Sequence, residues 1–145
     1  MIYKPNRTVD KFFIHYTSSD IHCNNDELIN IIRKWHIERG FNDIGYHFVI
    51  NKDGSILTGR RLEVTPAAQK GHNTGSIAIA LHYKDAYTQP QENSLIALTG
   101  VFNQLYNGQL KFLGHKDVAN TLCPGSIPYK ELLNLDNEGF INNAC

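Results

Sequence analysis

The chain has 145 residues, the length of one domain that can bury a hydrophobic core of its own. Fourteen basic and fourteen acidic side chains cancel, so composition gives no indication of a nucleic acid or an anionic membrane as partner. No segment approaches the roughly 20 apolar residues of a membrane span or resembles a signal peptide, so we expect synthesis in a cytoplasm and delivery elsewhere only by another factor.

The first predicted elements are a strand and a helix. Residues 11–16, KFFIHY, are aromatic and β-branched and precede the polar run TSSD, which is typical of a buried strand. Asn24 and Asn25 are N-cap residues for a helix that starts at Asp26, and Gly40 is a natural stop. Apolar side chains recur along one face of this helix, at Leu28, Ile31, Ile32 and Trp35.

A hairpin and a third strand follow. Residues 46–51, YHFVIN, predict a second strand, and the turn Lys52-Asp53-Gly54 leads into its partner SILTG. Residues 76–83, SIAIALHY, predict a third major strand, in which small residues alternate with β-branched ones.

The last third of the chain begins with a second helix. Pro90 opens it, Asn107-Gly108 ends it, and its apolar stripe consists of Leu95, Leu98, Phe102, Leu105 and Tyr106. Residues 111–115, KFLGH, predict a final strand. After a loop with Cys123-Pro124-Gly125 we expect a helical turn near residues 129–133 and a loose polar tail.

The element order βαβββαβ predicts an α/β (α+β) fold. We expect a single domain over residues 1–145, with a central mixed β-sheet of about five strands flanked by helices. Sites in such folds lie at strand ends and in the loops beyond them. His15 and His115 stand at the polar ends of predicted strands, which makes them available for chemistry.

A candidate metal centre combines these two histidines with a cysteine. The chain has three cysteines, Cys23, Cys123 and Cys145, and this small odd number indicates free or metal-bound thiols in a reducing compartment. Catalytic zinc takes three nitrogen or sulfur ligands and keeps a fourth position for water, and His15, His115 and Cys123 form such a set. Spacing alone leaves two interpretations open: one zinc site, or two unrelated histidines and a buried thiol.

Four ordered motifs resemble those of the zinc-dependent N-acetylmuramoyl-L-alanine amidases, a family that includes short phage endolysins and animal peptidoglycan recognition proteins. The motifs are FFIHYT, IIRKWHIERGFNDIGYHFVINKDGSILTGR, KGHNTGSIAIAL and GHKDVANTLCPGS. The resemblance runs from Phe12 to Pro128, nearly the whole chain, and the ordered combination is far more specific than any one motif. It implies hydrolysis of the amide bond between N-acetylmuramic acid and L-alanine in peptidoglycan.

The resemblance also implies which residues carry the chemistry. His15, His115 and Cys123 match the residues that hold one Zn²⁺ in the family, and because relatives without the cysteine only bind peptidoglycan, Cys123 implies an active enzyme. Tyr46 matches a tyrosine that lies beside the zinc-bound water. Thr121 stands where some phage enzymes have a catalytic lysine and the animal branch has threonine.

Other polar positions carry weaker expectations. The resemblance places His72 and Asn73 along the substrate groove, although Gly71 and Asn73 are also ordinary turn residues. Some relatives have a glutamate where this chain has Ala80, so no general base is identified. His36 and His47 are interpreted as structural groups, and His82 and Lys116 as surface groups. No role is assigned to His22.

Several functions share these features. The small size, without a cell-wall-anchoring domain or a signal peptide, favours a phage endolysin that lyses a Gram-negative host. Thr121 and the missing carboxylate leave a binding-only peptidoglycan module open. A wall-recycling enzyme or a delivered toxin would use the same chemistry. Some phage amidases of this size also bind a viral RNA polymerase, and nothing in the sequence identifies such a surface. We expect a monomer that binds peptidoglycan but not nucleic acid, inserts into no membrane, and acts on the cell wall in the periplasm after release.

Overall fold

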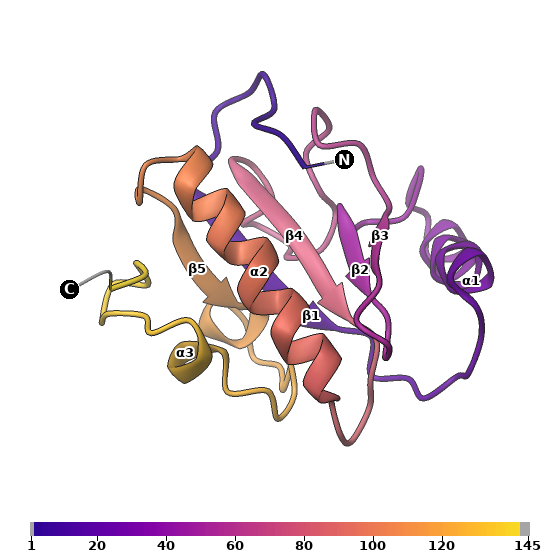
Figure 1. The fold of residues 1–145 in the computed structure, drawn as a ribbon. Helices are drawn as coiled ribbons and strands as arrows, with labels where there is room; N and C mark the ends of the chain where they lie inside the picture. The colour runs from indigo at the N-terminus through magenta and orange to yellow at the C-terminus, as the bar shows by residue number, and fades with distance from the viewer. Residues whose placement is uncertain (1, 143–145) are drawn as a thin grey trace.

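Five strands form one mixed sheet in the order β3-β2-β4-β1-β5 in the computed structural model, which describes residues 2–142 (Figure 1). The strands are β1 (Lys11–Tyr16), β2 (Phe48–Ile50), β3 (Ile56–Thr58), β4 (Ser76–Leu81) and β5 (Lys111–Gly114). β1 runs parallel to β4 and β5, β2 runs parallel to β4, and β3 is antiparallel to β2. The carboxyl ends of β1, β2, β4 and β5 therefore meet at one edge of the sheet.

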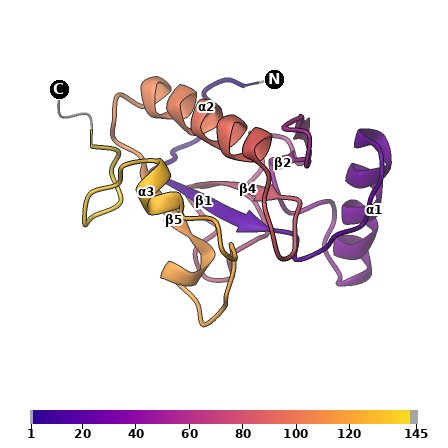
Figure 2. The same ribbon diagram turned by 60° about the horizontal axis from the view of Figure 1, so that its bottom comes forward.

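The two long helices pack against opposite faces of this sheet. In Figure 2, α2 lies above the sheet and α1 lies beside it, near β2. α2 (Gln89–Leu105) packs Leu95, Leu98 and Phe102 against one face, which includes Phe12 and Ile14 of β1. α1 (Asn25–Glu38) packs Leu28 and Ile32 against Val49 on the other face. The 3₁₀ turn η1 (His115–Asp117) and the short helix α3 (Tyr129–Leu132) follow β5.

Both long helices begin at side-chain caps, and the sequence predicts the first of them. The Asn24 side chain accepts a hydrogen bond from the Glu27 amide at 2.9 Å, and the Glu27 carboxylate accepts one from the Asn24 amide at 3.3 Å. Thr88 and Gln91 form the same capping box at the start of α2. The predicted fold class, element order and helix positions are confirmed, with shifts of one residue at helix starts.

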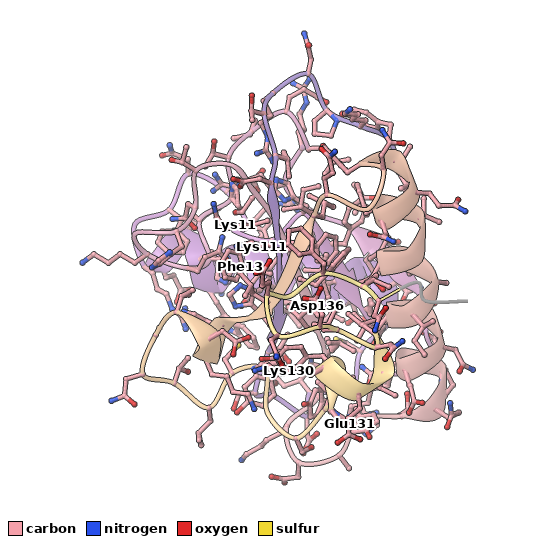
Figure 3. The ribbon with its side chains drawn as sticks, turned by 90° about the vertical axis from the view of Figure 1, so that its left-hand side faces the viewer. Lys11, Phe13, Lys111, Lys130, Glu131 and Asp136 are labelled. Carbon is pink, nitrogen blue, oxygen red and sulfur yellow. The ribbon has the colours of Figure 1, made fainter. Side chains whose placement is uncertain are left out.

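Three predicted segments differ from the structure, and one of them is the strand over residues 76–83, which ends at Leu81. The predicted strand over residues 46–51 is shorter, because only Phe48–Ile50 pairs with both neighbouring strands. The expected loose tail folds back as far as Asn142: Leu135 bridges Ile141, and the Phe112 amide donates to the Gly139 carbonyl at 2.7 Å. Figure 3 shows this segment, marked by Asp136, in front of β1 and β5.

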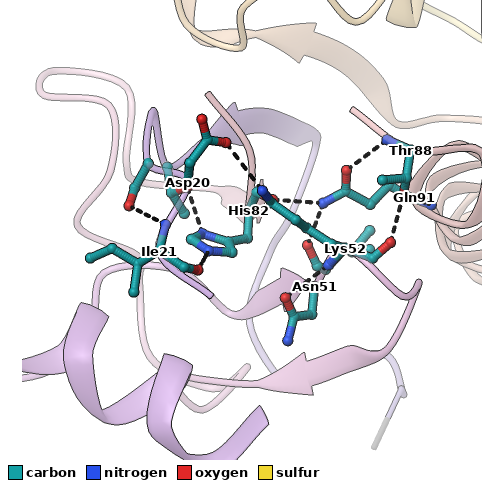
Figure 4. Close-up of polar contacts among 10 residues, drawn as sticks. Asp20, Ile21, Asn51, Lys52, His82, Thr88 and Gln91 are labelled. Atoms are coloured by element: carbon teal, nitrogen blue, oxygen red, sulfur yellow. Dashed lines mark hydrogen bonds and ion pairs between the residues drawn. The ribbon is translucent and has the colours of Figure 1, made fainter. Parts of the chain in front are cut away.

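His82 was expected at the surface, and that prediction is wrong. Its side chain is fully buried, with Nε2 donating to the Ile21 carbonyl at 2.7 Å and Nδ1 lying 2.9 Å from the Thr17 hydroxyl (Figure 4). It ties the loop after β1 to the end of β4. Cys145 lies outside the described residues, and none of the helices within them is long and apolar enough to cross a membrane.

Candidate metal centre and groove

His15, His115 and Cys123 converge at the carboxyl edge of the sheet. His15 lies near the end of β1, His115 directly follows β5, and Cys123 lies in the loop beyond η1. One ligand atom from each residue lies within 4.8 Å of the other two, and the two imidazole centroids are 4.7 Å apart. The structure thus brings together the three residues that the sequence predicts as one site.

The loop that carries Cys123 is held by contacts on both sides. The Lys116 amide donates to the Cys123 carbonyl at 2.8 Å, which ties this loop to the turn at His115. The Tyr83 hydroxyl donates to the Pro124 carbonyl and accepts from the Ile127 amide. Gly125 has φ +81°, and a Cβ there would come within 2.7 Å of the Tyr83 hydroxyl, so this tight approach requires glycine.

The turn at His115 is fixed by an acidic side chain two residues further on. The Asp117 carboxylate accepts hydrogen bonds from the Gly114 amide at 2.8 Å and from the Tyr129 hydroxyl at 2.6 Å. These bonds lower the pKa of Asp117 against the opposing effect of burial, which is the largest influence on it. The carboxylate therefore stays ionised and fixes the backbone that presents His115.

Burial sets the protonation of the three candidate ligands. It lowers the pKa of His15 to about 3 and raises the pKa of the Cys123 thiol to about 11. Burial, followed by the charge of His72, also lowers the pKa of His115. The imidazoles are therefore neutral at neutral pH and have lone pairs for a metal, and a thiol loses its proton when it coordinates one.

The donor set fits zinc in both chemistry and spacing. Tetrahedral zinc has bonds of about 2.0–2.1 Å to nitrogen and about 2.3 Å to sulfur, which separates its ligand atoms by roughly 3.5 Å. His15 Nδ1 lies 3.5 Å from Cys123 Sγ. Three protein ligands leave the fourth zinc position for water or substrate, the arrangement of catalytic rather than structural sites.

A groove of about 340 Å³ opens beside His115, one of the three candidate ligands. It is lined by His36, Arg39, Phe41, Tyr46, Ala67, Ala68, Lys70, Asn73 and His115. Among the described residues 2–142, this lining contains two basic side chains, Arg39 and Lys70, and no carboxylate. The groove therefore suits a ligand with anionic groups.

Tyr46 lies between the metal centre and the groove. Its ring centroid is 5.3 Å from that of His15 and 5.2 Å from that of His36. Burial raises the pKa of Tyr46 well above its usual value, so the hydroxyl remains a hydrogen-bond donor at neutral pH. His36 holds the backbone next to it, because its Nδ1 accepts a hydrogen bond from the Gly45 amide at 2.7 Å.

The other predicted site residues lie at different distances from this centre. Thr121 is close to Cys123, whose amide donates to the Thr121 hydroxyl at 3.2 Å. Asn73 lines the groove, but its side-chain oxygen accepts from the amides of Ala68 and Gln69, at 3.0 and 2.9 Å, and so shapes a turn. His72 is exposed beside the groove and is not part of its lining.

Sequence reasoning missed Gln69. This side chain is 1% exposed, and its Oε1 lies 2.8 Å from Nε2 of His15. The two residues are 54 positions apart, and a glutamine between alanine and lysine in a loop gives no sequence signal of such a contact. Ala80 lies in register opposite His15 and is fully buried, so a methyl group occupies the position where some relatives carry a glutamate.

The structure is that of a small α/β protein with two histidines and a cysteine placed so that they could hold a metal ion. Comparison with known proteins then gives the family, because the profile of N-acetylmuramoyl-L-alanine amidase matches residues 5–126. The chain is 35% identical to the endolysin of Enterobacteria phage K11 over 121 residues, 79% of each chain. It is 36% identical to peptidoglycan-recognition protein LB of Drosophila melanogaster over 113 residues, 74% of this chain and 49% of that protein.

A solved structure supports the same assignment. N-acetylmuramoyl-L-alanine amidase LysC from Clostridium intestinale URNW superposes with a TM-score of 0.75 at 32% identity, covering 89% of this chain and 85% of that one. The chain therefore belongs to the N-acetylmuramoyl-L-alanine amidase family, and its enzyme class is that of an amidase. The family and fold expected from the four sequence motifs are confirmed.

Proposed function

We propose that this chain is a phage endolysin that hydrolyses the amide bond between N-acetylmuramic acid and L-alanine in peptidoglycan, with one Zn²⁺ held by His15, His115 and Cys123. The observation that carries this proposal is the convergence of the three ligand atoms within 4.8 Å of one another, next to a groove that can take a substrate. The phage K11 endolysin, similar over 79% of both chains, supports the biological role.

Amide hydrolysis needs a nucleophile and a stabilised oxyanion. Zinc, when bound, supplies a water of lowered pKa and polarises a carbonyl. Tyr46 keeps its proton because burial raises its pKa, so its hydroxyl is the proposed donor to the developing oxyanion. The Thr121 hydroxyl accepts from the Cys123 amide, which leaves its own proton free as a second donor without the positive charge of a lysine.

The groove charge agrees with peptidoglycan as the substrate. The peptide part of peptidoglycan carries carboxylates, and Arg39 and Lys70 line the groove. Opposite charges attract the substrate and orient it more than they add affinity. Asn73 lines the same groove and His72 lies beside it, so both remain proposed substrate contacts.

The endolysins of phages K11 and T3, to which this chain is similar, support the proposed place of action. We propose that the chain acts as a monomer on the cell wall, and that another factor releases it from the compartment in which it is made.

The test is digestion of purified Gram-negative sacculi, with mass spectrometry of the products, in the presence of added zinc or of a chelator. Free stem peptides that begin with L-alanine, together with intact glycan strands, are the expected products, and the chelator should abolish them. Peptides that persist after prolonged chelation would remove zinc from the proposal. Sacculi that bind the protein but stay uncut would identify a binding module instead.

A further inference from the structure

A buried chain of hydrogen bonds lies behind His15, on the side away from Cys123. The two imidazole nitrogens of His15 have different partners: Nδ1 lies 3.5 Å from Cys123 Sγ, and Nε2 lies 2.8 Å from Oε1 of Gln69. His15 and Gln69 are each 1% exposed, so water does not compete for these contacts. The nitrogen that carries the proton is therefore decided by the protein groups around it.

The direction of each hydrogen bond in this chain can be read from its last acceptor. The Ser76 hydroxyl lies 2.8 Å from the Asn73 carbonyl, which can only accept, so Ser76 donates there. With its proton used, the Ser76 oxygen accepts from Nε2 of Gln69 at 2.7 Å. The same Gln69 nitrogen also donates to the His72 carbonyl at 3.3 Å.

These bonds fix the orientation of the Gln69 amide. Its nitrogen must face Ser76 and the His72 carbonyl, so its oxygen must face His15. An amide oxygen is an acceptor only, and Nε2 of His15 must therefore carry the proton. The lone pair of the neutral imidazole is then on Nδ1, on the side of Cys123.

The backbone of Gln69 is held as firmly as its side chain. The Asn73 side chain accepts from the Gln69 amide at 2.9 Å, and the Gln69 carbonyl accepts from the His72 amide at 2.8 Å. Ser76 opens β4, the strand that pairs with β1, so the chain of bonds starts from the sheet that also carries His15. The loop therefore presents Gln69 to His15 in one orientation.

We propose that Gln69 is a positioning residue that holds His15 in the Nε2–H tautomer and so makes Nδ1 its metal-binding atom. The tautomer is inferred from the hydrogen bonds alone, whereas its effect on metal binding rests on the proposed zinc function. A partner on the second nitrogen of a metal-binding histidine fixes the ring and the tautomer, and its loss typically lowers metal affinity by 10–100-fold. In this chain the partner is a neutral amide, which can neither take up a proton nor give one to the imidazole.

The first measurement is the tautomer of His15, from long-range ¹H–¹⁵N correlation spectra of the protein as purified and after zinc loading. His15→Gln removes one imidazole and assigns its signals. The wild-type protein should show the Nε2–H form of His15. Gln69→Leu, which removes the acceptor, should show a mixture of tautomers before zinc is added.

The second measurement is zinc affinity by competition with a chromophoric chelator. Gln69→Leu should weaken zinc binding by at least ~10-fold. Gln69→Glu keeps an acceptor for Nε2–H but loses the donor to Ser76 and to the His72 carbonyl, so it should restore the tautomer and part of the affinity. Gln91→Leu is the matched control, because Gln91 is also fully buried and donates to two backbone carbonyls, those of Ile50 and His82 (Figure 4). It should lower thermal stability and leave zinc affinity within about two-fold.

The outcomes separate this inference from the proposed function. A proton on Nδ1 of His15 in the wild-type protein, or unchanged zinc affinity in folded Gln69→Leu, would overturn the role of Gln69. A wild-type protein that binds no zinc would overturn the zinc function, while the tautomer spectra would still decide whether Gln69 controls His15. If Gln69→Leu does not fold, loss of the Nε2–H form in Gln69→Glu would count against the proposal.

Discussion

Cys123 supplies the sulfur donor of the candidate metal centre, and its surroundings make it a weak acid until a metal is present. Burial raises its pKa to about 11, so the metal-free site holds a thiol at neutral pH. A serine hydroxyl is far harder to deprotonate and is a poorer zinc ligand. Replacement of this cysteine should therefore remove metal binding while the groove can still bind sacculi.

We expect Cys123→Ser to lose stoichiometric zinc and to abolish cleavage of sacculi while binding to sacculi is retained. Zinc content by mass spectrometry, product release and a pull-down with sacculi measure the three properties. Cys23→Ser is the matched control, because Cys23 is a free cysteine outside the metal cluster, and it should keep all three. Cleavage by Cys123→Ser with one bound zinc would show that the ligand set is wrong.

Tyr46 is the second residue whose role can be isolated. Its hydroxyl is the proposed oxyanion donor, and removal of one such donor lowers turnover by about 10²–10³-fold. We expect Tyr46→Phe to lose at least ~10² in kcat while zinc content and melting temperature stay near the wild-type values. Tyr87→Phe, on the α2 side of the core, should leave turnover unchanged. Near-normal turnover in Tyr46→Phe would remove this residue from the mechanism.

At this scale the sequence predicts the three candidate ligands, which the structure brings together, but not the residue that positions His15. His15, His115 and Cys123 lie in short motifs that the resemblance aligns one by one. Gln69 acts on His15 across 54 positions, through a loop whose path depends on Asn73 and Ser76. A contact of that kind is a property of the tertiary structure, and propensity or periodicity does not encode it.

Among the secondary-structure elements, the helices and long strands were predictable because local rules and tertiary packing agree. Asn24 and Thr88 are favoured caps, and each helix presents its apolar face to the sheet. β2 is shorter than predicted. Tyr46 and His47 have side chains that are common in strands, but they lie in the segment that leads into β2. The segment of residues 134–142 is held by a bridge between Leu135 and Ile141 and by the hydrogen bond from Phe112 to Gly139. No local sequence pattern predicts either contact.

The segment that leads into β2 carries Tyr46, and a close backbone contact at Gly45 holds it in place. The Gly45 carbonyl accepts from the Ala67 amide at 3.2 Å, and a Cβ on Gly45 would overlap the carbonyl oxygen of Ala67. This close contact joins the loop that carries Tyr46 to the loop that carries Gln69. A side chain at position 45 would therefore push the two loops apart.

We expect Gly45→Ala to lower the free energy of unfolding by about 1–3 kcal/mol, because overpacking forces the backbone to shift. Turnover should fall as well, because Tyr46 moves with its loop. Gly100→Ala is the matched control: Gly100 lies within α2, a Cβ there meets nothing within 4 Å, and alanine should raise stability by up to ~1 kcal/mol. Urea unfolding and kcat on sacculi measure both effects, and a neutral Gly45→Ala would mean that the two loops separate freely.

For the molecule as a whole, buried histidines make the fold sensitive to acid. Nδ1 of His47 accepts from the Ala78 amide at 3.1 Å, while Nε2 donates to the Val64 carbonyl at 2.8 Å. Nδ1 of His36 accepts from the Gly45 amide in the same way. A second proton on either ring would place an N–H group opposite an N–H group, so the folded state favours the neutral form of both imidazoles.

Burial, the largest cause in each case, lowers the pKa of His36 and of His47 to about 4, from the usual 6.5. Below pH 6.5 the unfolded chain therefore binds protons that the folded chain does not, and stability falls as the pH falls. The loss ends near pH 4, where the folded state also takes up the protons. One such histidine contributes on the order of 3 kcal/mol over this window.

We therefore expect the free energy of unfolding to fall steadily between pH 6.5 and pH 4, with a slope that approaches 1.4 kcal/mol per pH unit for each buried histidine. Urea unfolding in the Cys123→Ser background keeps zinc release from adding its own pH dependence. His47→Gln in that background should unfold more easily at pH 7. Its free energy of unfolding should depend less on pH, by the equivalent of about one proton, because glutamine does not titrate. A free energy that stays constant from pH 7 to 4.5 in the parent would mean that these imidazoles take up protons without loss of structure, and that the two amides they hold find other acceptors.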